Sequence, residues 1–200
     1  NGDWLTPMLA GEPFMDKPPL FYWTAAVFAK LLTSYLPLHD GARIASGFYS
    51  ALSLFFLGLA GRKLYGENRG WAAAIILIGC LGMLVRAHQM ITDLALLSGC
   101  AMMLYGYSHS QERFLRAGFW IGMGVGIGFM SQGFIAPILF VLISAALPTL
   151  FQVWRQKNYL RSLIVAAFVA LPWLTIWPGL LYLSSPKLFS EWAWTHNIGH

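Results

Sequence analysis

A carboxylate and a lysine stand side by side near the start of the chain. Asp16 and Lys17 come directly before Pro18 and Pro19, and the apolar residues 20–38 follow. Charged groups at the edge of hydrocarbon lose solvation energy, so membrane proteins that retain them usually bind something charged there. Lys17 also has a simpler interpretation as an interfacial anchor, because long cationic side chains extend to lipid headgroups. The segment therefore predicts an anion-binding site, with an anchor as the alternative.

A second polar cluster lies between two apolar stretches. Arg86, His88 and Asp93 bring a cation, a titratable imidazole and a carboxylate within eight residues. These residue types can hold an anion and take a proton from a reacting group. With Thr92 beside it, Asp93 has the alternative role of a helix N-cap, worth about 1 kcal/mol. The cluster predicts either a second part of a site or a helix start.

The end of the chain carries two histidines. His196 and His200 are four residues apart, a spacing that would place both on one helix face, where they could bind a metal. Asn197 and Gly199 disfavour a helix at this place. The sequence therefore requires no cofactor and leaves a divalent metal open.

Together these residues suit one kind of reaction. The chain has no Gly-x-Ser-x-Gly elbow and no P-loop, so acyl transfer and ATP hydrolysis lack support. Cations can hold a departing phosphate, a carboxylate can accept a proton, and aromatic rings can hold a prenyl chain or a sugar. The inventory predicts group transfer from a lipid-linked phosphate donor.

A multi-span transporter without such chemistry is the alternative function. It predicts polar residues inside the spans, near the membrane midplane and at broken helices. The charges instead lie at the ends of the apolar stretches, although prolines interrupt those stretches at Pro137, Pro148, Pro172 and Pro178. Group transfer is therefore the preferred hypothesis.

The composition indicates the class of protein that holds these residues. Of 200 residues, 58% are hydrophobic and 10% are charged, whereas a soluble domain carries about 25% charge, so an integral membrane protein is expected in a lipid bilayer. Cys80 and Cys100 lie in apolar runs and predict no disulfide framework. The net charge of +5 is scattered rather than gathered in one stripe, which argues against nucleic acid as a partner.

Six apolar stretches are expected to cross the membrane, since a span needs roughly 20 apolar residues. Ser131-Gln132-Gly133 joins the fourth stretch to the fifth and predicts a tight helical hairpin. Alternate glycines at 122–128 predict close helix packing rather than a phosphate-binding loop. The expected fold is an all-α polytopic bundle with spans at residues 43–60, 70–85, 91–108, 117–130, 134–151 and 162–183.

The distribution of Lys and Arg predicts the orientation. Eight of the thirteen basic residues lie in the loops that connect the first span to the second, the third to the fourth and the fifth to the sixth, so these loops are expected to be cytoplasmic. This requires residues 20–38 to form a juxtamembrane helix instead of a span. The three polar segments then share the outer side. We expect an outer loop with juxtamembrane helices at 1–42, six spans at 43–183 and the start of another outer loop at 184–200.

Several motifs follow one another in the order found in one enzyme family. Across essentially its whole length the chain resembles the bacterial aminoarabinose transferase and protein-mannosyltransferase family of GT-C glycosyltransferases. It opens on Asn1 without an initiator methionine, so we expect an internal part of a longer protein. The matching motifs are Gly2-Asp3-Trp4-Leu5-Thr6-Pro7, Asp16-Lys17-Pro18-Pro19-Leu20, Ala42-Arg43-Ile44-Ala45-Ser46, Gly61-Arg62-Lys63-Leu64-Tyr65-Gly66 and Leu171-Pro172-Trp173.

The resemblance implies an enzyme of the bacterial inner membrane whose site faces the periplasm. It would move a sugar from a polyprenyl-phosphate donor to lipid A, a protein or another glycan. The implied fold is a GT-C-type transmembrane helix bundle with periplasmic juxtamembrane helices. The family's principal catalytic Asp belongs to a motif upstream of Gly2, outside this chain, so residues 1–200 alone are expected to be inactive.

The resemblance also implies roles for individual residues. Lys17 matches the lysine that contacts the lipid phosphate, and Asp16 replaces the usual Glu beside it. Asp93 matches an acid of the second outer loop, so Asp93 and Asp16 are the catalytic candidates. Arg86 and His200 are expected to assist at the phosphate. Substrate contacts are expected from Tyr22, His88, His196 and Asn197.

Two positions depart from the family pattern. His200 stands where Arg is usual, and His is fully charged only when it is protonated. Gln132 replaces a frequent Lys and removes one cation from the hairpin. The expected reaction is a single inverting displacement. In it the upstream Asp is the base toward the acceptor hydroxyl, and Lys17, aided by Arg86 or His200, stabilises the departing lipid phosphate.

Overall fold

The structure is a computed structural model that describes residues 4–9, 11–80 and 89–195. Strands β1 (Met8–Leu9) and β2 (Glu12–Pro13) pair antiparallel in a small hairpin, and Gly11 in its turn has a φ of 90°. This left-handed conformation favours glycine, which lacks a Cβ. The other regular elements in the described residues are helices, so the predicted all-α class is confirmed.

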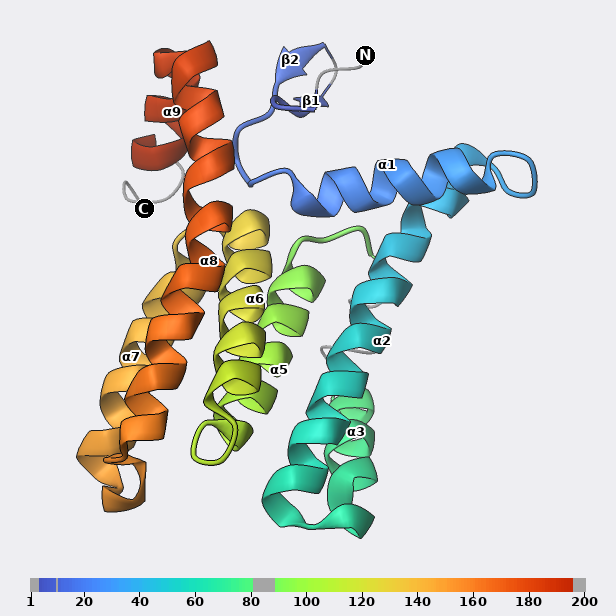
Figure 1. Ribbon diagram of the computed structural model, residues 1–200. Coiled ribbons are helices and arrows are strands. Elements are labelled where there is room, and N and C mark those ends of the chain that lie inside the picture. Colours follow the sequence, from blue (N-terminus) through green and yellow to red (C-terminus); the bar gives the residue numbers. More distant parts are fainter. Residues whose placement is uncertain (1–3, 10, 81–88, 196–200) are drawn as a thin grey trace.

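Six helices of the described chain form a bundle, and α1 (Leu20–Leu32) lies across one end of it (Figure 1). Helix α3 packs on α2, α2 on α5, α5 on α6, and α6 on both α7 and α8. The bundle helices are α2 (Leu38–Tyr65), α3 (Gly70–Gly79), α5 (Asp93–His109), α6 (Phe114–Gln132), α7 (Ile135–Leu150) and α8 (Lys157–Ser184). Short elements complete the chain: η1 (Glu67–Arg69), η2 (Gln152–Trp154), α9 (Pro186–Ser190) and the π-helical turn η3 (Glu191–Thr195).

The bundle helices fall on the six apolar stretches predicted from the sequence. Helices α2, α6 and α8 are long and apolar enough to cross a membrane, while α3 and α7 are shorter apolar helices. Helix α2 begins at Leu38, ahead of the predicted stretch 43–60, and the second stretch ends outside the described residues. That all six stretches cross the membrane stays a prediction.

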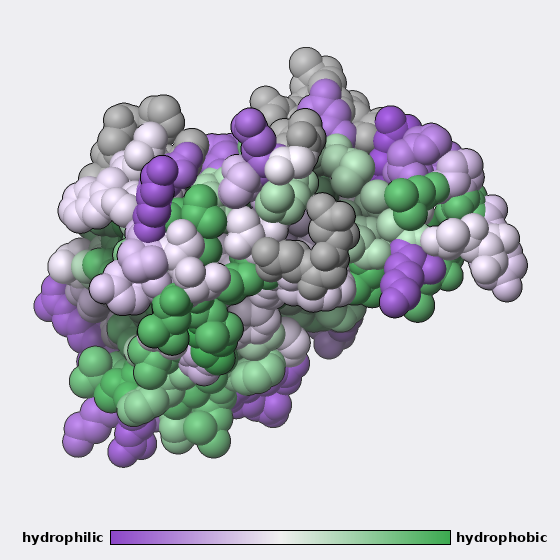
Figure 2. Space-filling view, turned by 90° about the horizontal axis from the view of Figure 1, so that it is seen from above, coloured by the Kyte–Doolittle hydropathy of each residue, from purple (hydrophilic) through white to green (hydrophobic). Residues whose placement is uncertain are grey.

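The sides of the bundle expose many large apolar residues. Such residues on a helix surface are typical of contact with lipid. Seen from the end that carries α1, hydrophilic side chains are interspersed with hydrophobic ones (Figure 2). The exposed apolar residues of α7 and α8 include Ile138, Val141, Leu142, Phe168 and Leu180.

Glycines allow α6 to occupy the centre of the bundle. A Cβ added at Gly122 would lie 2.6 Å from the carbonyl oxygen of Ala166 on α8. Gly118 and Gly126 also face α8, whereas Gly124 faces α5. Since no side chain fits at these contacts, the prediction of close helix packing is confirmed.

The predicted tight hairpin is present between α6 and α7. Helix α6 ends at Gln132, and Gly133 has a φ of 69°, which again favours glycine. The Gly133 N–H donates to the carbonyl of Phe129 at 2.8 Å, and α7 begins at Ile135. The C-terminal end of α6, whose last residue is Gln132, lies at the bundle end that α1 crosses (Figure 1).

Helix α1 is held against the start of α2. Gly41 allows a close approach, because a Cβ there would lie 3.1 Å from the Cα of Ala29. The ring of Phe21 stacks on Tyr49 at 5.9 Å, and the hydroxyls of Thr24 and Tyr49 are 2.8 Å apart. A helix that crosses the bundle end suits the predicted juxtamembrane location, which stays a prediction.

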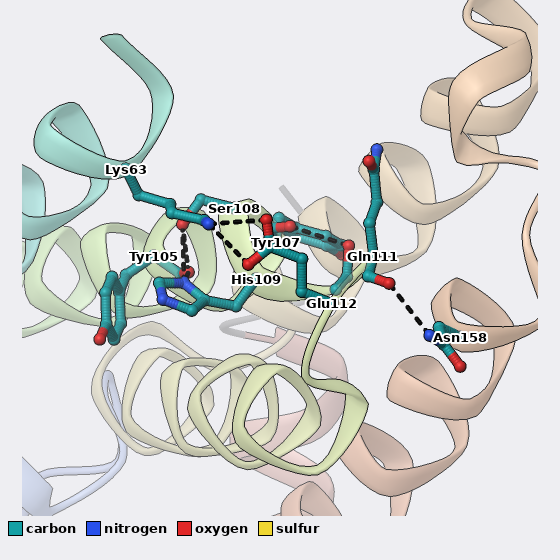
Figure 3. A network of polar contacts seen from close by, with 9 residues as sticks. Lys63, Tyr105, Tyr107, Ser108, His109, Gln111, Glu112 and Asn158 are labelled. Carbon is teal, nitrogen blue, oxygen red and sulfur yellow. Dashed lines mark hydrogen bonds and ion pairs between the residues drawn. The ribbon is translucent and has the colours of Figure 1, made fainter. Parts of the chain in front are cut away.

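A polar network ties helices together at the opposite end of the bundle (Figure 3). The ammonium of Lys63, in the last turn of α2, lies 2.6 Å from the carboxylate of Glu112 in the α5–α6 loop. The hydrogen bond from Lys63, followed by its positive charge, lowers the pKa of Glu112. Asn158 at the start of α8 donates to the carbonyl of Gln111 at 3.0 Å. The three basic loops therefore lie together, away from α1.

Candidate functional site

Two buried prolines hold the Asp16–Lys17 pair at the start of α1. Pro18 and Pro19 are fully buried, whereas Asp16 and Lys17 are partly exposed. Pro19 is the N-cap of α1, and its carbonyl accepts from the Trp23 N–H at 2.8 Å. Because proline has a fixed φ and no N–H to leave unpaired, it suits a helix start. The prolines thus fix the position of the partly exposed Asp16 and Lys17 just before α1.

Hydrogen bonds from two tryptophans join the N-terminal segment to helices α1 and α8. The indole N–H of Trp23 donates to the carbonyl of Trp4 at 2.7 Å. The indole N–H of Trp177, on α8, donates to the carbonyl of Leu5 at 3.1 Å. These two bonds hold the segment before Asp16 over the ends of α1 and α8.

Tyr22 lies in the first turn of α1, near Asp16. Its ring meets Phe14 edge-on with the ring centres 6.1 Å apart. Burial of the hydroxyl and, second, the negative charge of Asp16 raise the pKa of Tyr22. The hydroxyl therefore keeps its proton at neutral pH and can donate a hydrogen bond.

A second polar group joins α5 to the α6–α7 turn. Asp93 is the first residue of α5, and Thr92 is its N-cap without a side-chain capping bond. Asp93 is therefore not the N-cap that the sequence offered as an alternative. Instead, the amide Nε2 of Gln132 donates to Asp93 Oδ1 and, at 3.0 Å, to Thr92 Oγ1. The sequence predicts only that Gln132 removes a cation from the hairpin, and it contains no signal of this contact with Asp93.

Packing of neighbouring residues brings the two polar groups to one end of the bundle. Phe21 of α1 shares an apolar cluster with Leu94 and Ala95, which directly follow Asp93, and with Ile127. A second apolar cluster contains residues from three segments. Met15 and Leu20 lie beside the charged pair, Phe129 and Met130 precede Gln132, and Trp192 lies in the C-terminal turn. Asp16, Lys17, Tyr22, Asp93 and Gln132 thus belong to segments that pack on one another.

The remaining predicted site residues lie outside the described residues. Arg86, His88, His196, Asn197 and His200 are in this group. The turn before His196 is anchored by Trp192, which is 1% exposed and meets the ring of Trp177 edge-on at 5.0 Å. Among the described residues, no group of three or more His, Cys, Asp or Glu side chains could hold a metal ion.

Comparison with known proteins identifies the family. The sequence model of the dolichyl-phosphate-mannose-protein mannosyltransferase family matches residues 16–177. The chain belongs to this family. The matched region begins at the Asp16–Lys17 pair and includes Tyr22, Asp93 and Gln132.

Individual members of the family are similar over the whole chain. Undecaprenyl phosphate-alpha-4-amino-4-deoxy-L-arabinose arabinosyl transferase 2 of Pseudomonas fluorescens is 30% identical over 99% of this chain and 34% of its own length. A similarly named transferase of Pseudomonas savastanoi pv. phaseolicola is 28% identical over 99% of this chain and 37% of its length. The chain thus spans about a third of these relatives, and the resemblance seen in its motifs is confirmed.

The fold is similar to that of ArnT from Cupriavidus metallidurans. The crystal structure of that protein bound to undecaprenyl phosphate gives a TM-score of 0.75 at 17% identity, over 98% of this chain and 37% of that chain. Its apo structure gives 0.73 at 18% identity, over 96% and 36%. At such identities the likeness concerns the fold, which is that of a multi-pass helical membrane protein.

Proposed function

We propose that the protein containing this chain is a glycosyltransferase that moves a sugar from a polyprenyl-phosphate donor. The observation that carries the proposal is the Asp16–Lys17 pair, held by two buried prolines at one end of an apolar bundle and included in the family match. The donors named for the relatives suggest 4-amino-4-deoxy-L-arabinose as the first sugar to test. Lipid A, a protein or another glycan is the proposed acceptor.

Lys17 is the proposed ligand of the donor phosphate. Within the described residues it takes part in no ion pair. The acceptor hydroxyl would attack the anomeric carbon, the bond from that carbon to the phosphate oxygen would break, and the lipid phosphate would leave with the electron pair. The Lys17 ammonium would stabilise the charge that develops on this oxygen, an effect that gains strength away from bulk water.

The carboxylates complete the proposed chemistry. Asp16 and Asp93 would face the sugar and the acceptor, and the proton of the acceptor hydroxyl would pass to the acid that the family resemblance implies upstream of residue 1. Arg86 and His200 are proposed to assist at the phosphate. The proposed substrate contacts are Tyr22, His88, His196 and Asn197.

An apolar groove lined in part by Trp23, in the first turns of α1, suits the prenyl chain of such a donor. It has a volume of about 390 Å³ and lies between α1, α6 and α8. Aromatic and aliphatic walls next to a few polar groups are typical of sites for amphipathic ligands. The groove is lined by Trp23, Met130, Pro172, Trp173, Ile176 and Trp177.

We further propose that this end of the bundle faces the periplasm of a bacterial inner membrane. The basic loops lie at the opposite end, and Lys and Arg are enriched on the cytoplasmic side of membrane proteins. A periplasmic site would give the enzyme access to acceptors outside the cytoplasm.

The test is sugar transfer in membranes that contain the full-length protein, with undecaprenyl phosphate-linked 4-amino-4-deoxy-L-arabinose as donor. We expect Lys17→Ala to lower the transfer rate about 10²- to 10³-fold, because one electrostatic donor is lost. Lys30→Ala, later in α1, is the matched control and should retain wild-type activity. Equal activity of Lys17→Ala and wild type would refute the phosphate role. A well-expressed wild type that transfers no sugar from any polyprenyl phosphate would favour the transporter instead.

A further inference from the structure

We infer that Gln132 is a positioning residue that orients the Asp93 carboxylate in the transfer reaction, an inference that rests on the proposed function. Gln132 ends α6 and Asp93 begins α5, so their contact joins two helix ends that are 39 residues apart in sequence. Both lie at the bundle end that carries Lys17. No feature of the local sequence pairs these two side chains.

The contact fixes the direction of both side chains. The amide nitrogen of Gln132 reaches Asp93 Oδ1 and Thr92 Oγ1, which are acceptors on adjacent residues. An ionised carboxylate only accepts hydrogen bonds, so the amide must present its N–H₂ group rather than its oxygen. With one hydrogen for each acceptor, the amide is held in one rotamer.

Burial makes the contact costly to break. Gln132 and Thr92 are each 7% exposed, whereas the Asp93 residue is exposed. A buried amide without partners would lose its hydrogen bonds to water without replacement. The Gln132 amide is therefore fixed inside the protein, and the Asp93 carboxylate lies at the surface, where a substrate can approach.

Gln132 and Asp93 both lie at helix ends whose backbone is hydrogen-bonded. Gly133 closes the last turn of α6, and the Ser131 hydroxyl donates to the carbonyl of Ile127 at 2.6 Å in the same turn. On the other side, the Thr92 carbonyl accepts from the N–H of Ala95 at 3.1 Å and starts α5. A reacting carboxylate held from fixed helix ends is better oriented than one on a loop. A charge-assisted hydrogen bond also adds directional strength.

The test compares transfer kinetics of full-length variants. Gln132→Met keeps the length of the side chain but removes the donor, and we expect kcat to fall about tenfold to a hundredfold with an unchanged KM for the donor. Gln132→Lys restores a donor and should recover most of kcat. Ser131→Ala is the matched control, because it removes a buried hydrogen bond of the same turn that does not reach Asp93.

A double-mutant cycle separates positioning from a structural role. If Gln132 acts through Asp93, adding Gln132→Met to Asp93→Asn should lower kcat no further than Asp93→Asn alone. The inference would be overturned if the losses of kcat caused by Gln132→Met and Asp93→Asn multiplied in the double variant. Equal losses of kcat in Gln132→Met and Ser131→Ala, or a wild-type kcat in Gln132→Met, would also overturn it. In each of those cases the wild type transfers sugar and the proposed function stands. A wild type without transfer would refute the proposed function and this inference together.

Discussion

At the scale of single residues, Tyr22 joins the packing of α1 to the charge of the Asp16–Lys17 pair. Its ring contacts Phe14 and Phe21 edge-on, at 6.1 and 6.2 Å, so the ring belongs to the apolar support of the site. Its hydroxyl has a raised pKa because of burial and the nearby Asp16. The ring thus serves packing, whereas the hydroxyl is the proposed donor to a phosphate or sugar oxygen of the substrate.

Tyr22→Phe separates these roles. We expect kcat/KM for transfer to fall about tenfold, since one hydrogen bond to the substrate is lost while the ring packing remains. Deprotonation would remove the donor only above the raised pKa, so the ratio of wild-type to variant activity should stay constant from about pH 7 to 9. Tyr35→Phe, on an exposed loop, is the control. A ratio that approaches one at the alkaline end would contradict the assignment.

At the scale of elements, α6 supports the proposed site because it packs on α5, α7 and α8 and ends at Gln132. Its contact with α8 leaves no room for a side chain at Gly122, whereas a Cβ at Gly179 on α8 would meet nothing within 4 Å. These two glycines therefore differ in environment although both lie in bundle helices. The difference predicts opposite responses to the same added methyl group.

Gly122→Ala should destabilise the protein by about 1–3 kcal/mol, the usual cost of overpacking. Gly179→Ala should be neutral or stabilising by up to about 1 kcal/mol, because alanine favours the helix and no neighbour has to move. Thermal unfolding of the purified protein in detergent measures both changes. Equal shifts in the two variants would show that the α6–α8 contact is looser than described.

Some elements could be predicted from the sequence because local signals determine them. Apolar stretches of about 20 residues located the bundle helices, and Gly133 marked the hairpin. The start of α2 at Leu38 was missed, since residues 38–42 continue the helix without adding to the apolar run. The bond between Gln132 and Asp93 could not be predicted, because a hydropathy pattern does not specify which helix ends meet.

At the scale of the whole molecule, the two ends of the bundle differ in chemistry. One end carries α1 and the α6–α7 turn (Figure 1), together with the Asp16–Lys17 pair just before α1 and Asp93 at the start of α5. The other carries the basic loops and the Lys63–Glu112 ion pair (Figure 3). The proposed donor site lies at the first end, so the side of the membrane that this end faces determines which acceptors the proposed enzyme can reach.

Single-cysteine labelling would determine this orientation. In a full-length background without other cysteines, Glu12→Cys marks the end that carries α1 and Glu67→Cys marks the basic end, since both positions are exposed. We expect a membrane-impermeant maleimide to label Glu12→Cys in cells with a permeabilised outer membrane, and Glu67→Cys only after lysis, because basic loops stay in the cytoplasm. Ala45→Cys, at a fully buried position, should remain unlabelled in both conditions. Labelling of Glu67→Cys before lysis, with Glu12→Cys protected, would place the site in the cytoplasm and exclude acceptors of the periplasm.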